Sequence, residues 1–378
     1  MRADMPWAGY PRDIAPNLTK LEKESVSYTR AYSVSSYTAM SIGGLLSGRY
    51  PGELERSGYF FSAYPDEVEF FPELLQRAGV RTLAGHAHFY FDKKSGFRQG
   101  FDDYRMVPGI GEDRTTAKEI TSPQHLALAL DQLGDPANTK GQFFAWYHFL
   151  DPHEAYRTHE GINFGPKVRD RYDGEIFYTD QHLGKLFDFV RSQPWGDRTA
   201  IVVTADHGEA FGEHKMVLHG FELWDMLTHV PMFIKVPGVD PRRIDTPRSA
   251  IDLAPTIFEL LGLPVPSTFQ GKSLVGEMNS NAAPEERDVV LDLPRTSDNF
   301  RRRALIVGRF KLLAYADDYR FELYDLVDDP AEKVDLRKTL PEVFDQMKTR
   351  YLERVKSIHD VCPKMRHKLK GKRKEKPC

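Results

Sequence analysis

Residues 199–219 read TAIVVTADHGEAFGEHKMVLH, in which a short apolar run passes directly into a segment rich in His, Asp, Glu and Gly. The β-branched residues of this run favour a strand, and in open α/β sheets ligands bind at the carboxyl ends of the strands. Asp206 and His207 stand at such an end, and His214 and His219 lie within reach on the following loop. A mixed His and Asp set suits zinc or manganese better than calcium, which prefers oxygen ligands. A solvated polar loop after a strand is the alternative interpretation.

The rest of the chain alternates short apolar runs with amphipathic helical patterns. Further runs of strand length occur at residues 142–150 and 230–236. Apolar residues recur at helical spacing at 72–78, 174–190 and 249–261. This alternation predicts an α/β fold.

The polar stretch NSNAAPEE at residues 279–286 predicts a linker. Three strand-like runs follow, at 288–293, 304–314 and 321–326, and then a helix at 341–358. We therefore predict three parts, which are a catalytic domain at 1–280, a small C-terminal α+β subdomain at 281–360, and a basic, disordered tail at 361–378.

The composition is that of a globular protein. Of the 378 residues 40% are hydrophobic and 28% are charged, which excludes a collagen-like or disordered chain. The net charge of −3 provides no field that would attract nucleic acid. Residues 363–378 contain eight Lys or Arg and one Glu, so this tail is either a solvated, disordered end or a segment that binds anionic lipid headgroups or nucleic acid. Only Cys362 and Cys378 are present, so no disulfide framework is expected to organise the fold.

Two further segments contain candidate histidines. His153 lies in LDPHEAY, directly after the aromatic run at 142–150, where it is placed to bind a metal or to donate a proton. His86 and His88 alternate in GHAHF, and a strand would put both on one face. Such a pair is more often structural or superficial than functional.

A hydroxyl-rich turn precedes an apolar helix in SSYTAMSIGGLLSGRYP, residues 35–51. Thr38 or Ser41 would then lie at a helix N-terminus, where free N–H groups favour an anion. The ordinary alternative is that Thr38 only caps the helix.

Nine segments, in this order, resemble the sulfatase family of the alkaline phosphatase superfamily. They cover nearly the whole chain and read GYPRDIAPNL, TAMSIGGLLSGRYP, AGVRTLAGHAHF, HFLDPHEAY, RYDGEIFYTDQHLG, VVTADHGEAFGEH, HVPMFIKVPG, IDLAPTIFELLG and ELYDLVDDPAEKVDL. The resemblance implies a central, mostly parallel sheet flanked by helices.

The resemblance places Thr38 at the nucleophile position, ten residues before Gly48. Sulfatases carry there a Cys or Ser that is converted to formylglycine, with an Arg at the position of Ile42, so we expect no formylglycine in this chain. Thr38-Ala39-Met40-Ser41 instead resembles the T-A-x-S segment of the phosphoethanolamine transferases, which use an unmodified threonine.

The resemblance also implies a role for each candidate residue. Asp206, His207 and Thr38 would hold a divalent metal, and the Thr38 alkoxide would attack phosphorus or sulfur to form a covalent ester. The remaining candidates would clamp the oxygens of the transferred group or protonate the leaving alcohol, as catalytic (His153, His86) or substrate-binding (His219, His88) residues. His214 would contact one of the metal ligands and not the metal itself.

The expected function is metal-dependent hydrolysis of a sulfate or phosphate ester. The alternatives are a phosphoethanolamine-type phosphotransferase acting on a lipid or glycan acceptor, and a non-catalytic anion- or glycan-binding protein that has lost its metal. The expected partners are small-molecule, glycan or lipid-headgroup esters and not nucleic acid. By resemblance the protein is periplasmic or membrane-anchored and extracytoplasmic, with membrane contact through a segment before Met1 or through the basic tail.

In the family a strand with an acidic metal ligand ends two residues before the position of Met1. Asp4 lies past that position and is not expected to replace the ligand. We therefore expect the natural start to lie upstream; the alternative is a chain that has lost the ligand.

Overall fold

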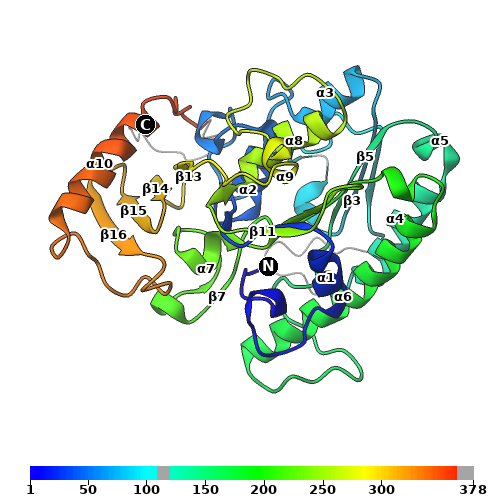
Figure 1. Ribbon diagram of the computed structural model, residues 1–378, viewed down its shortest axis with the longest axis horizontal. Helices are drawn as coiled ribbons and strands as arrows, with labels where there is room; N and C mark the ends of the chain where they lie inside the picture. The colour runs from blue at the N-terminus through cyan, green and yellow to red at the C-terminus, as the bar shows by residue number, and fades with distance from the viewer. Residues whose placement is uncertain (93, 109–119, 364–378) are drawn as a thin grey trace, which may run out of the picture.

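The strands of the computed structural model form a layer between two groups of helices (Figure 1). The structure describes residues 1–92, 94–108 and 120–363, so the predicted basic tail lies outside the described residues from residue 364 on. The predicted α/β class is confirmed.

One half of the central layer is a parallel three-stranded sheet. Its order is β4-β3-β5, and both outer strands run parallel to β3. The strands are β3 (Arg81–His86), β4 (Asp103–Met106) and β5 (Phe143–His148). The parallel arrangement implied by the resemblance holds in this half.

The other half is a mixed four-stranded sheet, ordered β11-β1-β10-β6. β1 and β11 are parallel, whereas β10 runs antiparallel to both β1 and β6. The strands are β1 (Val26–Tyr28), β6 (Ile201–Thr204), β10 (Met232–Lys235) and β11 (Arg242–Ile244). Of these four strands β1, β6 and β11 therefore run in the same direction and β10 runs against them, so the mostly parallel arrangement implied by the resemblance holds in this half as well.

Helices cover both faces of the layer (Figure 1). On one face α6 packs against α1 and α4, and on the other α2 packs against α3 and α8. These helices are α1 (Pro16–Lys23), α2 (Thr38–Ser47), α3 (Phe71–Arg77), α4 (Ser122–Gly134), α6 (Val168–Ser192) and α8 (Leu253–Leu260). None of the helices within the described residues is long and apolar enough to cross a membrane.

An antiparallel sheet with one helix follows the central layer in sequence. It comprises β13 (Val289–Leu293), β14 (Arg302–Val307), β15 (Phe310–Tyr315), β16 (Arg320–Asp325) and α10 (Pro341–Val355), which packs on β14 and β15. The run at 304–314, expected as one strand, is a hairpin because Gly308 has a φ of 54° and reverses the chain. Buried Leu291 and Ile306 share one apolar cluster with Tyr32 and Met40, so this sheet packs directly on the rest of the protein.

Short elements connect these parts. The short strands are β2 (Ala31–Tyr32), β7 (Ala210–Phe211), β8 (Val217–Leu218), β9 (His229–Val230) and β12 (Arg248–Ser249). The short helices are α5 (Pro136–Thr139), α7 (Asp225–Thr228) and α9 (Val275–Met278). Single 3-10 turns occur at Pro6–Ala8, Pro51–Glu53, Phe89–Phe91, Gly196–Arg198, Glu213–Lys215 and Ala250–Asp252.

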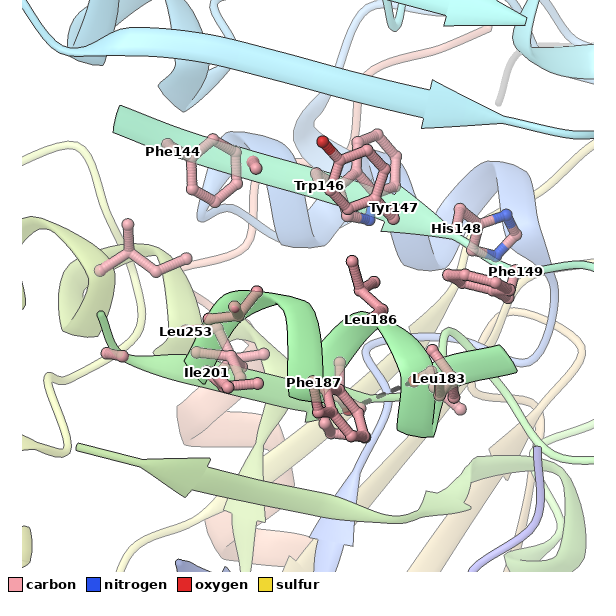
Figure 2. Close-up of a pocket in the computed structure, with 18 of the residues that line it drawn as sticks. Phe144, Trp146, Tyr147, His148, Phe149, Leu183, Leu186, Phe187, Ile201 and Leu253 are labelled. Carbon is pink, nitrogen blue, oxygen red and sulfur yellow. Dashed lines mark hydrogen bonds between the residues drawn. The ribbon is translucent and has the colours of Figure 1, made fainter. Parts of the chain in front are cut away.

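A cavity separates the two halves of the central layer. β5 is the last strand of one half and β6 is the last strand of the other. The space between them has a volume of about 850 Å³ and is lined mainly by apolar side chains (Figure 2). We call it the interstrand cavity.

Candidate active site

The candidate site lies where the carboxyl end of β6 meets the first turn of α2. Asp206 and His207 follow β6 directly, as expected, and Thr38 is the first residue of α2. The Oγ1 atom of Thr38 lies 3.2 Å from Nε2 of His207. The same Nε2 lies 3.3 Å from Oδ2 of Asp206, so the three predicted metal ligands meet.

Thr38 does not cap its helix. Tyr37, with extended backbone, occupies the capping position, and no side chain caps this end. The hydroxyl of Thr38 is therefore directed to His207 and not to the helix backbone, and the alternative interpretation of Thr38 as a cap is wrong.

The imidazole of His207 is fixed in one tautomer. Its Nδ1 lies 2.8 Å from the carbonyl oxygen of Gly208, to which it must donate, so the lone pair is on Nε2. Burial lowers the pKa of His207 to about 3, and the ring is therefore neutral at pH 7. Metal-binding histidines characteristically donate their second ring N–H to a carbonyl or carboxylate in this way.

Four imidazoles stand in a row beside Thr38. The ring of His219 lies 4.1 Å from that of His207, His153 lies 5.2 Å from His219, and His88 lies 5.8 Å from His153. These four residues, which we call the histidine row, come from three segments far apart in sequence. The fold thus brings together His153, predicted as catalytic, with His219 and His88, predicted to bind substrate.

Local partners orient the rest of the histidine row. His153 donates from Nδ1 to the carbonyl of Glu154 at 2.8 Å, and His219 faces the Glu209 carboxylate at 3.2 Å. Nδ1 of His88 accepts from the N–H of Tyr90 at 3.3 Å, so its own proton is on Nε2. Burial lowers the pKa of His88 to about 3 and also lowers that of His153. The rings of His88 and His153 are therefore neutral at pH 7.

His86 lies apart from the row. β3 ends at His86, so the alternation does not continue to His88, and the expectation that both lie on one face is wrong. The His86 ring is fully buried and stacks on Phe91 at 4.4 Å. The His86 ring lies 6.4 Å from the His148 ring. His148, and not His86, is the residue that approaches Asp206, with Nε2 3.6 Å from Oδ2.

Two site residues were not among the sequence candidates. His148 ends β5 and places Nε2 3.6 Å from Oδ2 of Asp206. Glu209, in the motif ADHGE, is buried beside His219. His148 is the last residue of its strand and Glu209 lies in the loop that follows β6, so both could have been found from the rule that polar groups at the carboxyl ends of strands build the site.

His214 is directed elsewhere. Its Nε2 donates to the carbonyl of Ala331 at 2.8 Å, and its ring stacks on Trp224 at 3.8 Å. The expectation that it supports a ligand is not met.

The donors present fit part of a metal centre. Zn–N distances of about 2.0–2.1 Å in a tetrahedral site imply ligand–ligand edges of roughly 3.3 Å, which match the separations of His207 from Asp206 and Thr38. The fixed Nε2 lone pair of His207 points to the same use. However, within the part of the chain that the structure describes, no group of three or more His, Cys, Asp or Glu side chains could hold a metal. A metal here would need Thr38 or a further ligand.

The chain is similar in sequence to two protein families and to curated relatives. The family described as Sulfatase matches residues 1–263, and the family described as N-sulphoglucosamine sulphohydrolase, C-terminal, matches residues 212–357. The ulvan-active sulfatase of Formosa agariphila is 26% identical over 329 residues, which are 75% of this chain. The chain spans 63% of the length of that relative.

Solved structures share the fold. The phosphonate monoester hydrolase of Agrobacterium radiobacter superposes with a TM-score of 0.76, at 17% identity and over 93% of both chains. BT4656, solved with its substrate D-glucosamine-2-N,6-O-disulfate, gives 0.74, at 17% identity and over 92% of this chain and 94% of that one. The sequence match over residues 1–263 shows that the chain belongs to the sulfatase family of the alkaline phosphatase superfamily.

Proposed function

We propose that the chain is an ester hydrolase of the sulfatase family that cleaves a sulfate or phosphate ester through a covalent ester on Thr38. The observation that carries the proposal is the 3.2 Å approach of the Thr38 hydroxyl to Nε2 of His207, at one end of the histidine row. A hydroxyl is a weak nucleophile unless a neighbouring group removes its proton or lowers its pKa.

Thr38 is well placed to attack an anion. As the first residue of α2, it lies beside backbone N–H groups that no helical carbonyl satisfies. These groups and the helix dipole favour the negative charge of a bound sulfate or phosphate ester. The nucleophile and the electrostatic attraction for its substrate therefore come from the same turn.

A bound substrate would change the protonation of the histidine row. An anion within a few ångströms favours the protonated form of an imidazole and raises its pKa. His219 and His88 would then donate to the oxygens of the transferred group, and His153 would pass a proton to the departing alcohol. Glu209 fixes the ring of His219 for this contact.

A divalent metal would use the same atoms as part of its ligand set. Zn²⁺ or Mn²⁺, held by Asp206, His207 and Thr38, would lower the pKa of the Thr38 hydroxyl. The burial-lowered pKa of His207 makes its Nε2 a better ligand than base, because a general base works best with a pKa near the working pH.

Exposed aromatic rings border the site. Phe60 stacks on Tyr37, the neighbour of Thr38, and half-exposed Phe221 stacks on Phe60 at 5.4 Å. Half-exposed Phe61 lies 6.4 Å from the His88 ring. Such flat apolar faces suit the carbon faces of a sugar. We therefore propose a small sulfated or phosphorylated sugar or a glycan as the substrate class.

Two other functions have an observation in their favour. The TAMS segment favours transfer to a lipid or glycan alcohol, and the partial metal set favours an anion-binding protein without catalysis. An extracytoplasmic location remains a proposal from the family resemblance. Release of free sulfate or phosphate without an added alcohol would support the hydrolase over the transferase.

The test is to trap the intermediate. The protein is incubated with 4-nitrophenyl sulfate and, separately, 4-nitrophenyl phosphate, quenched in acid, and digested for mass spectrometry. We expect one added SO₃ or PO₃H group on the peptide that contains Thr38, and none in Thr38→Ala. Release of 4-nitrophenol by Thr38→Ala at the wild-type rate would refute the proposal.

A further inference from the structure

His219 lies in a segment whose backbone is strained. Residues 212–224, which we call the His219 loop, connect β7 to α7. Four residues of this loop other than Gly have a positive φ, which L-residues rarely adopt: His214, Lys215, Leu218 and Phe221. Such a backbone persists only where the surrounding structure holds it. The contacts that hold the loop therefore decide where the imidazole of His219 lies.

The segments around Thr38 hold one side of the loop. The N–H of Gly220 donates to the carbonyl of Ser36 at 2.9 Å, and Ser36 lies two residues before Thr38. The ring of Phe221 stacks on Phe60 at 5.4 Å. These contacts tie the His219 loop to the turn that carries the proposed nucleophile.

The antiparallel sheet and the turn after it hold the other side. His214 donates from Nε2 to the carbonyl of Ala331, which follows β16. The Glu222 carboxylate lies 2.8 Å from Nε of Arg302 on β14. The loop is thus held between two parts of the protein that are far apart in sequence.

A buried ion pair fixes the end of the loop. The N–H of Asp225, the first residue of α7, donates to Oε2 of Glu332 at 2.5 Å. Nζ of Lys311 on β15 lies 2.8 Å from Oε1 of the same carboxylate and 4.0 Å from Oδ1 of Asp225. The side chains of Lys311 and Glu332 are almost entirely buried. One carboxylate thus joins α7 to the antiparallel sheet, beside which α7 lies in Figure 1.

α7 passes this restraint on to the site. The carbonyl of Met226 accepts the N–H of Glu209 at 3.0 Å, and the carbonyl of Leu227 accepts that of Gly208 at 2.8 Å. The Glu209 carboxylate in turn lies 3.2 Å from Nδ1 of His219. A shift of α7 would therefore move Glu209 directly and His219 through the loop.

We propose that Glu332 is a positioning residue of the active site, which through Asp225 and α7 holds His219 and Glu209 in place. Lys311 fixes the Glu332 carboxylate for this contact. The catalytic part of the proposal rests on the proposed function, in which His219 donates to the transferred group. The proposal gives a role to the segment ELYDLVDDPAEKVDL, residues 322–336, in which Glu332 lies.

Two double variants test the acceptor that Glu332 offers to α7. In both, Lys311→Met removes the buried positive charge. Glu332→Gln keeps an amide oxygen for the N–H of Asp225 and gives the acceptor variant, whereas Glu332→Leu gives the acceptor-free variant. Replacing a buried ion pair by residues of similar volume is often neutral for stability, so we expect both variants to fold.

We expect kcat for a 4-nitrophenyl ester to be about 10–100-fold lower in the acceptor-free variant than in the acceptor variant, with little change in KM. The amides of residues 217–222 should exchange with deuterium about 10-fold faster in the acceptor-free variant, and those of 143–148 equally in both. A purely structural role of Glu332 would lower the melting temperature and leave kcat of the folded protein unchanged.

Equal kcat in the two double variants would overturn the proposal, whether or not their exchange differs. If the acceptor-free variant does not fold, Glu332→Asp takes its place, because it keeps a charge for Lys311 but withdraws the carboxylate from α7. Wild-type kcat and wild-type exchange in Glu332→Asp would equally overturn the proposal.

Failure of the proposed function gives a different result. A wild-type protein that forms no ester on Thr38 would refute that function, and exchange of residues 217–222 would still decide whether Glu332 holds the His219 loop. In that case equal exchange in the two double variants overturns the proposal, and faster exchange in the acceptor-free variant supports it.

Discussion

The hydroxyl of Thr38 lies 3.2 Å from Nε2 of His207, although the two residues are 169 positions apart in the chain. The contact joins the first turn of a helix to the carboxyl end of a strand, and it places the proposed nucleophile at the end of a row of imidazoles.

Removing the hydroxyl of Thr38 should abolish turnover without unfolding the protein. We expect Thr38→Ala to lower kcat about 10⁴-fold or more, as removal of a nucleophile does, and to leave the melting temperature within a few degrees of wild type. Thr38→Ser keeps the oxygen and should retain measurable activity. Steady-state kinetics and thermal unfolding measure both effects. Equal loss in the Ser and Ala variants would argue against a nucleophilic hydroxyl.

Glu209 should act through His219. Its carboxylate holds Nδ1 of His219 at 3.2 Å, so Glu209→Gln removes the charge while keeping an acceptor. We expect kcat to fall about 10–100-fold with little change in KM. Glu213→Gln is the matched control, because Glu213 pairs with Arg2 and not with the histidine row. An equal effect of both substitutions on kcat would contradict the assignment.

Zinc or manganese should stabilise the wild-type protein more than calcium does. A ligand at about 100 times its Kd adds roughly 2.7 kcal/mol to the free energy of unfolding, visible as a rise in the melting temperature. His207→Ala should lose this rise. His214→Ala should keep it, because His214 binds Ala331 instead. The same rise in His207→Ala would place the metal elsewhere.

The aromatic rings beside the site, Phe60, Phe61 and Phe221, should affect substrate binding more than the rate of the chemical step. Phe61→Ala removes an exposed ring beside His88, and we expect KM for a sulfated sugar to rise several-fold while kcat changes little. Tyr319→Ala, at a fully exposed turn of the antiparallel sheet, is the control. A fall in kcat without a change in KM would assign Phe61 to the chemical step.

The contribution of Asp252 to the free energy of unfolding should fall between pH 4 and 6. Burial raises the pKa of Asp252 from 3.8 to about 6, so the folded state keeps a proton that the unfolded chain has already lost. By linkage, up to about 3 kcal/mol of unfolding free energy disappears as the pH rises through this window.

The side chain of the Asp252→Asn variant is neutral at every pH. The substitution should therefore remove the part of the pH dependence of the unfolding free energy that comes from Asp252. Its amide oxygen can still accept the backbone N–H of Lys272, which Asp252 accepts at 2.8 Å. Urea unfolding of both proteins at pH 4, 5 and 6 measures the difference. Parallel profiles for the two proteins would show that Asp252 does not titrate in this range.

The sequence predicted the local parts of the site better than its assembly. The β-branched run at 201–203 and the polar residues after it located Asp206 and His207, because strand and loop signals lie within a few residues. That these two residues lie close to Thr38 could be predicted only from the family resemblance. Long-range contacts leave no local periodicity from which they could be inferred.

The sequence misplaced His86 and missed His148 because it did not show the residue at which each strand ends. Because β3 stops at His86 and β5 stops at His148, the first histidine turns into the core and the second reaches Asp206. An alternating pattern does not report the residue at which a strand ends.

The apolar cluster shared by β13, β14, β2 and α2 has a thermodynamic consequence. Leu291 and Ile306 of the antiparallel sheet are buried only while Tyr32 and Met40 stay in place. Unfolding of either the antiparallel sheet or the segment of β2 and α2 would therefore expose apolar side chains of the other. Exposed apolar area sets the free-energy cost of partial unfolding. The antiparallel sheet and the central layer should therefore denature in one cooperative calorimetric transition, with equal van't Hoff and calorimetric enthalpies.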